Sequence, residues 1–218
     1  MNEWDDYWER KYNFHNKLYD LIAVQYRKYI IKPYLKKYIY SHFTKNSILL
    51  HAGCGGGQVE GDIVNDFTII SMDKSQNALK LYNLNHNTHY LIYGDILQTG
   101  LKSESFDGIY NLGVMEHFTK EEIHNILLEF HRILKPNGAI ILFAPPEYGS
   151  TVLFFKGVHY ILNNILNMNI KFQPAEINRI QSRSWLEEII QNTGFTITEF
   201  NFEFTDLYTH IAIVLKKN

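Results

Sequence analysis

The chain has 218 residues, a formal net charge of -2 and a hydrophobic fraction of 45%, values typical of a soluble globular protein with one domain. This charge gives no general attraction to a polyanion, so no nucleic-acid partner is expected. Cys54 is the single cysteine, which excludes an internal disulfide, and the acidic, aromatic start shows no signal-peptide pattern. No apolar run approaches the roughly 20 residues of a membrane span, and we expect a cytoplasmic protein.

Residues 1–45 are predicted to form an N-terminal helical cap. Aromatic side chains recur there at spacings of three and four, which indicates a helix that packs this stripe on the main body: Trp4, Tyr7, Trp8, Tyr12 and Phe14. A second helical segment covers 16–43, and Pro33 should kink it or start a new helix. Its basic cluster is either a solvated face or a surface for a membrane or an acidic substrate.

The next stretch, 47–57, combines a short apolar run with glycines at Gly53, Gly55 and Gly57. This pattern predicts a buried parallel strand with a sharp exit loop whose backbone can approach a ligand. A dinucleotide fingerprint would need glycine where Gln58 stands, and a P-loop would need Lys followed by Ser or Thr where Gln58 and Val59 stand. A nicotinamide-dependent oxidoreductase is therefore the less favoured alternative.

A short helix is predicted over 58–66 and a strand over 67–72, which ends at Asp73. Asp73 lies twenty positions after Gly53, where an acidic side chain at the end of the second strand can accept hydrogen bonds from ribose hydroxyls. The alternative is that Asp73 caps the following helix, although Ser75 already suits that role.

The remaining pattern alternates between strands and helices. Strands are expected over 89–93, 105–112 and 139–144, and helices over 75–85, 120–134 and from 183 to about 194. The last two strands, 195–204 and 207–215, are expected to form an antiparallel pair. The chain is thus predicted to be an α/β protein with a doubly wound, mostly parallel seven-stranded sheet and helices on both faces. Residues 46–218 form its main domain, with a helical insert at about 148–180, in a single structural unit with the cap.

At the glycine motif, "HAGCGGG", the chain resembles the class I S-adenosylmethionine (SAM) dependent methyltransferases, whose first motif reads acidic-x-G-x-G-x-G. His51 departs from it, because the family has Asp or Glu there. The resemblance continues in "FDGIYNL" with the following "GVMEHF", and in "RILKPNGAIILFAPP". Asn137 replaces a glycine in the last string, which the left-handed tolerance of Asn permits.

The resemblance implies SAM as methyl donor and S-adenosylhomocysteine (SAH) as product. In the family's pattern Asp95 would hydrogen-bond the adenine amine and Ile96 would pack on its ring, the alternative being an ordinary Gly-Asp turn. His51 would order the loop or a water, or would weaken cofactor binding. The full set of cofactor-binding residues implied is His51, Gly53, Cys54, Gly55, Gly57, Asp73, Lys74, Asp95, Ile96, Asn111, Leu112 and Gly113, with Tyr12 and Tyr19 as lid residues.

The implied reaction is an in-line transfer of the methyl group to an O or N nucleophile of a small-molecule acceptor. Alignment of the nucleophile can supply roughly 7–11 kcal/mol of the acceleration. His117 is the first candidate base, because imidazole titrates near neutral pH, or it hydrogen-bonds the loop after the fourth strand. Glu147 and His159 are weaker candidates.

Other functions are less favoured. Because His51 replaces the family's acidic residue, the chain could instead be a regulatory subunit that binds SAM without catalysis. No metal site is expected, because His86 and His89 lack a third ligand nearby. "APPE" lies after the fifth strand, whereas the similar box of amino-methylating DNA enzymes follows the fourth, so DNA methylation is not expected. The apolar run at 152–168 is a lid over the substrate, a dimer contact or a lipid-contacting helix, in that order.

Overall fold

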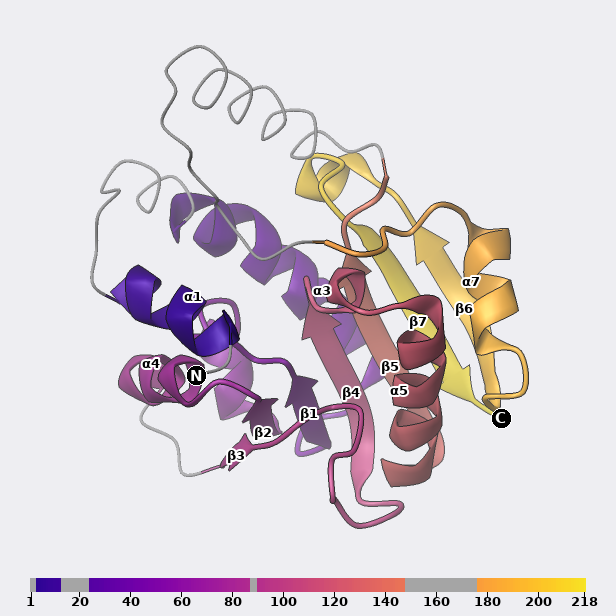
Figure 1. Cartoon of the computed structure of the whole chain (residues 1–218), viewed down its shortest axis with the longest axis horizontal. Coiled ribbons are helices and arrows are strands. Elements are labelled where there is room, and N and C mark those ends of the chain that lie inside the picture. The colour runs from indigo at the N-terminus through magenta and orange to yellow at the C-terminus, as the bar shows by residue number, and fades with distance from the viewer. Residues whose placement is uncertain (1–2, 13–23, 87–89, 148–175) are drawn as a thin grey trace.

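Seven strands form one sheet in the order β3-β2-β1-β4-β5-β7-β6 (Figure 1). The computed structural model describes residues 3–12, 24–86, 90–147 and 176–218. The strands are β1 (Ile48–Ala52), β2 (Thr68–Asp73), β3 (Leu91–Tyr93), β4 (Phe106–Leu112), β5 (Leu134–Ala144), β6 (Phe195–Asn201) and β7 (Ile211–Lys217). The first five run parallel to one another, and β7 runs antiparallel to both β5 and β6. The predicted fold class is confirmed.

Strand β1 lies inside the sheet, between β2 and β4. The chain moves outward from β1 to β2 and β3, and then crosses back to place β4 on the other side of β1. A parallel sheet whose strand order reverses in this way has a crevice outside the carboxyl ends of the strands, where ligands bind. The glycine loop begins at this point, because it directly follows β1.

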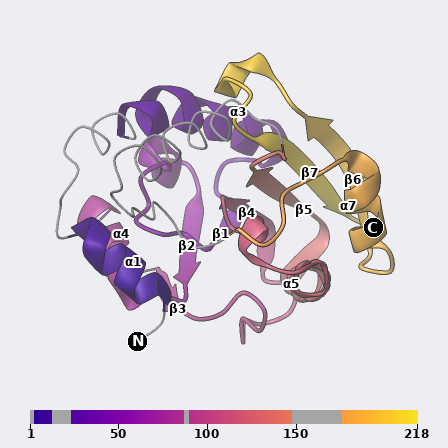
Figure 2. The ribbon, with the colours of Figure 1, turned by 45° about the horizontal axis from the view of Figure 1, so that its top comes forward.

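Two hydrophobic cores cover the two faces of the sheet. Helix α5 (Lys120–Ile133) and helix α7 (Arg183–Ile190) lie on one face (Figure 2). Their apolar residues are buried in the core on that face. On the other face lie helix α3 (Lys32–His42) and the short 3-10 helix η2 (Gly61–Asn65). The three α-helices present apolar residues at three- and four-residue spacings to the strands, which fixes each on its face, whereas η2 buries Ile63.

The N-terminal part divides into two regions. Helix α1 (Glu3–Tyr12) packs on helix α4 (Gln76–His86). The π-helix η1 (Arg27–Ile31) runs directly into α3, whose second residue is Pro33, and the backbone stays helical through the junction, so Pro33 coincides with a change of helix type and not with the start of a separate helix. A π-helical turn suits this position, because Pro33 has no amide to donate to the preceding turn. Helix α3 is buried against the sheet, and the predicted boundary at residue 45 stays a prediction.

Several boundaries differ from the sequence-based expectation. Strand β5 begins at Leu134 rather than at 139, because Leu134 pairs with Phe106 ahead of an irregularity in the β4–β5 register. Asn137 adopts a φ of 61°, the left-handed conformation expected of it. The expected helix at 58–66 is only the 3-10 turn η2.

The C-terminal hairpin also differs. The connection from β6 to β7 takes up 202–210 and contains the 3-10 helix η5 (Phe204–Asp206), so β7 begins later than predicted. The greater part of the expected insert, 148–175, lies outside the described residues, and so do Tyr19, His89 and His159. None of the helices within the described ranges combines the length and hydropathy that a bilayer span requires.

Candidate active site

A pocket opens at the carboxyl ends of β1, β2 and β4. The space in and above it, open solvent included, is about 540 Å³, and it is lined by Trp4, Trp8, Gly53, Gly55, Asp73, Lys74, Gly94, Asp95, Ile96, Gly113, Val114, His117 and Phe118. The lining therefore draws together the glycine loop, both predicted acidic residues and the predicted base, although these come from distant parts of the sequence.

The glycine loop is fixed to β2 by its own backbone. The amides of Gly53 and Cys54 both donate to the carbonyl of Met72, at 2.8 and 3.0 Å, and the amide of Gly55 donates to Oδ2 of Asp73 at 2.8 Å. Gly55 has a φ of +50°, and a Cβ at this residue would lie 2.6 Å from the ring of Trp8. Glycine is therefore required here both for the backbone conformation and for close packing.

Asp73 uses both carboxylate oxygens within the site. Its Oδ1 accepts a hydrogen bond from the amide of Ser75 at 2.8 Å, while Oδ2 holds Gly55. Burial raises the pKa of Asp73, and the two amides act in the opposite direction. Ser75 is the helix cap, because its Oγ accepts from the amide of Ala78 at 3.2 Å. Asp73 thus orders the loop and faces the pocket.

Asp95 and Ile96 form the next part of the wall. Oδ1 of Asp95 accepts from the amide of Leu97 at 3.0 Å, so the Gly-Asp turn that was the alternative is present. Asp95 is nevertheless exposed at the pocket, with Ile96 buried beside it. A carboxylate next to an apolar side chain is the pair expected for an adenine amine and its ring.

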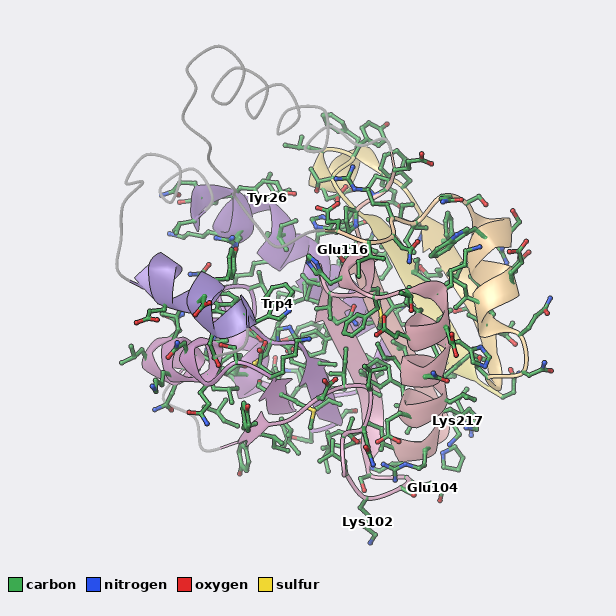
Figure 3. All side chains as sticks on the ribbon, in the orientation of Figure 1. Trp4, Tyr26, Lys102, Glu104, Glu116 and Lys217 are labelled. Carbon is green, nitrogen blue, oxygen red and sulfur yellow. The ribbon has the colours of Figure 1, made fainter. Side chains whose placement is uncertain are left out.

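Helix α1 supplies an aromatic wall. It is held on α4 by Asp5, whose Oδ1 accepts from Ser75 Oγ at 2.6 Å and whose carbonyl accepts from Asn77 at 3.2 Å. Trp4, which is labelled in Figure 3, contacts His117 edge to face, with ring centroids 4.8 Å apart. Lys74 Nζ lies 6.0 Å from the Trp4 ring.

Five lining residues were not predicted: Trp4, Trp8, Gly94, Val114 and Phe118. The aromatic stripe was the available signal for the two tryptophans, but the same spacing equally predicts packing. Tyr12, predicted to lie over the cofactor, is in α1, but the structure does not describe its side chain, and Tyr19 is outside the described residues.

The end of β4 provides only part of the predicted methionine-binding wall. Gly113 lines the pocket, whereas Leu112 packs against the core under α3. Leu112 points away because successive strand residues face opposite sides of a sheet. Asn111 is buried outside the lining, and within the described part of the chain its Nδ2 has no hydrogen-bond partner.

Glu116 was missed although it precedes His117 in the short helix η3 (Met115–His117). Its carboxyl is buried, and burial raises its pKa to about 8. Its carbonyl accepts from the amides of Ile177 and Asn178 at 2.7 and 3.0 Å, so Glu116, labelled in Figure 3, holds this later part of the chain against η3.

The remaining predicted residues, His51 in β1 and Cys54 and Gly57 in the glycine loop, lie outside the pocket lining. Nδ1 of His51 hydrogen-bonds Oε1 of Glu60, and the His51 ring stacks on Tyr110 with centroids 4.4 Å apart. Cys54 is buried, and burial raises the pKa of its thiol. The carboxylate missing at position 51 is therefore present nearby, on Glu60.

The fold and this site are similar to those of the class I, Rossmann-like SAM-dependent methyltransferases that the motifs resemble: a glycine loop follows β1, an acidic residue ends β2 and a second one follows β3, at the point where the strand order reverses. Residues 50–142 match the family described as "Methyltransferase domain". This match agrees with the resemblance to SAM-dependent methyltransferases that the motifs predict.

Three similar proteins illustrate the match. A protein of Encephalitozoon cuniculi (strain GB-M1) named "Putative methyltransferase" is 27% identical over 181 residues, which cover 79% of this chain and 81% of that protein. A SAM dependent methyltransferase from Archaeoglobus fulgidus superposes with a TM-score of 0.65 at 17% identity, covering 92% of this chain and 100% of that one. Magnesium protoporphyrin IX methyltransferase from Synechocystis PCC 6803, solved with bound SAH, gives a TM-score of 0.63 at 15% identity, covering 98% and 94%. The two structural similarities show the shared fold.

Proposed function

We propose that this protein transfers the methyl group of SAM to an oxygen or nitrogen nucleophile of a small molecule. The observation that carries the proposal is the pocket that joins the glycine loop, Asp73 and Asp95 to the titratable imidazole of His117. The first three fit an adenosyl group, and the fourth fits an acceptor that loses a proton.

The side chains divide the cofactor between them in this proposal. Asp73 accepts from the ribose hydroxyls, and Asp95 accepts from the adenine amine above the apolar surface of Ile96. Gly113 borders the methionine end. SAM supplies a methyl group already attached to a good leaving group, a sulfonium, so the task left to the chain is to align the acceptor.

His117 is the general base in this proposal. Its ring is fixed edge to face against Trp4 in the pocket wall. A neutral imidazole there accepts the proton of an O–H or N–H nucleophile during attack, which contributes typically 10²–10⁴-fold in such reactions. This is why we favour an oxygen or nitrogen acceptor.

The proposal is tested in two stages. Calorimetric titration with SAM and SAH should show binding to the folded protein, and its absence would refute the function. Tritiated SAM is then incubated with a panel of small amines, phenols and carboxylic acids. His117→Asn should lower methyl transfer at least about 100-fold while it keeps SAH affinity.

His124→Asn is the matched control, because His124 bonds the carbonyl of Ile189 on the α5 side, outside the pocket lining. SAM binding without transfer to any acceptor would favour the regulatory-subunit alternative. That alternative was suggested by His51, which stands where the family has an acidic residue. A carboxylate is nevertheless present beside it, on Glu60, to which His51 is hydrogen-bonded.

We also propose a cytoplasmic location and no nucleic-acid partner, on the strength of the single, buried cysteine and the net charge of -2.

A further inference from the structure

A cluster of polar side chains is buried behind the glycine loop, outside the pocket lining. We call it the Glu60 cluster, and it consists of His51, Glu60, Tyr82, His86 and Tyr110. Glu60 is fully buried at its centre, just before η2. A buried charge persists only where it is paired and hydrogen-bonded, so its partners show what it does.

The partners of Glu60 all donate to it. Oε1 accepts from His51 Nδ1, from the hydroxyl of Tyr82 at 3.1 Å and from that of Tyr110 at 3.4 Å. Burial acts to raise the pKa of Glu60, but His51 and then His86 hold it below its ordinary value. Glu60 is therefore a carboxylate that fixes three donors.

The cluster contacts the glycine loop through one face of α4. The ring of Tyr82 lies 2.4 Å from where a Cβ of Gly57 would be, so it presses directly on the loop backbone. His86 Nε2 donates to the carbonyl of Gly57 and lies 3.7 Å from Oε2 of Glu60. Asn85 donates to the carbonyl of Gly56 at 2.6 Å.

We infer that Glu60 is a positioning residue for the cofactor: it takes the place of the acidic residue that the first motif lacks at position 51, and it sets the glycine loop through His51, Tyr82 and His86. The inference rests on the proposed function, because the loop matters only if it binds SAM. The loop is held from the pocket side by Asp73 and from behind by the Glu60 cluster. A shift of its backbone by a few tenths of an ångström would change the pocket wall that Gly53 and Gly55 form.

This arrangement has a specific consequence for position 51. Placing the family's usual acidic residue there, as His51→Glu, should be harmful, because two carboxylates would meet in a buried site. The double variant His51→Glu with Glu60→Gln should be tolerated. In it, the side-chain amide introduced at position 60 donates to the new carboxylate, and its carbonyl still accepts from Tyr82 and Tyr110.

The test measures the dissociation constant of SAH by calorimetry, corrected for the folded fraction, together with the melting temperature. E60Q and H51E should each weaken SAH binding at least about tenfold, and the double variant should recover most of that loss. Tyr82→Phe removes one donor without touching the charge, and should weaken SAH binding several-fold even if E60Q fails to fold.

Asp206→Asn is the matched control. Asp206 is equally buried, and accepts from the amide of His210 at 2.7 Å and from Thr209 Oγ1 at 2.8 Å, but it lies in the turn between β6 and β7. It should lower the melting temperature and leave SAH affinity unchanged. Wild-type SAH affinity in E60Q or Y82F, or an equal loss in D206N, would overturn the inference. Absence of SAH binding by the wild type would instead refute the proposed function on which the inference rests.

Discussion

The amide of Gly55 donates a hydrogen bond to the carboxylate of Asp73 at 2.8 Å, and this contact ties the loop after β1 to the end of β2. The same carboxylate accepts from the amide of Ser75, at the start of α4. One side chain therefore sets the position of the glycine loop and of a helix, and it faces the pocket as well.

Asp73→Asn should weaken SAH binding at least about tenfold and lower the free energy of unfolding by about 1.5–3 kcal/mol. The side-chain amide of the variant has one acceptor oxygen, whereas the carboxylate has two. Its NH2 group would therefore face the backbone N–H of either Gly55 or Ser75, and that hydrogen bond would be lost. Calorimetry and urea denaturation measure the two effects. Asp107→Asn is the control, because Asp107 accepts from the amide of Ile48 at 2.8 Å at the amino ends of β1 and β4, away from the pocket. Asp107→Asn should lower the free energy of unfolding and leave SAH affinity unchanged. An equal loss of SAH affinity in this variant would argue against a specific role for Asp73.

Gly55→Ala should disrupt the contact between the loop and α1. Its Cβ would meet Trp8 at 2.6 Å, and its φ of +50° strains any side chain. Gly100→Ala separates the two effects, because Gly100 has a φ of +66° with nothing within 4 Å of its Cβ position. Both variants should lose about 1–2 kcal/mol of stability through strain. Only G55A should shift the tryptophan fluorescence and weaken SAH binding, and similar fluorescence in both variants would contradict this.

Glu116 should make the protein less stable as the pH rises. The pKa of its carboxyl is raised from 4.5 to about 8. Between these values the folded protein keeps the proton that the unfolded chain has released, so the free energy of unfolding falls across this window and levels off above it. Glu116→Gln stays neutral and should be more stable than the wild type at pH 9, as urea denaturation at pH 6 and pH 9 would show. Parallel pH profiles for the two proteins would refute the prediction.

Trp4→Ala should speed the release of SAH. The ring of Trp4 lines the pocket and packs against His117 with centroids 4.8 Å apart. Its removal takes away an apolar wall of the pocket, and most effects of such truncations appear in the dissociation rate. Stopped-flow displacement of SAH measures this rate, and an increase of about tenfold or more is expected. Leu84→Ala truncates an exposed apolar residue of α4 and should leave the rate unchanged.

The sequence by itself determined the fold class and the edge of the sheet at which the site lies. Periodicity identifies strands and helices from local residues, and the carboxyl ends of neighbouring parallel strands must share one edge. The spacing of Gly53 and Gly55 and the positions of Asp73 and Asp95 could therefore be read without coordinates.

Only the tertiary structure decided which residues meet across long stretches of chain. Trp8 packs on Gly55, Glu60 pairs with His51, and Glu116 holds the chain at Ile177. Leu112 packs against the core, and this could be known only once the structure showed which face of the sheet its side chain lies on. These contacts depend on how helices pack on strands, which local pattern does not encode, because many packings satisfy the same periodicity.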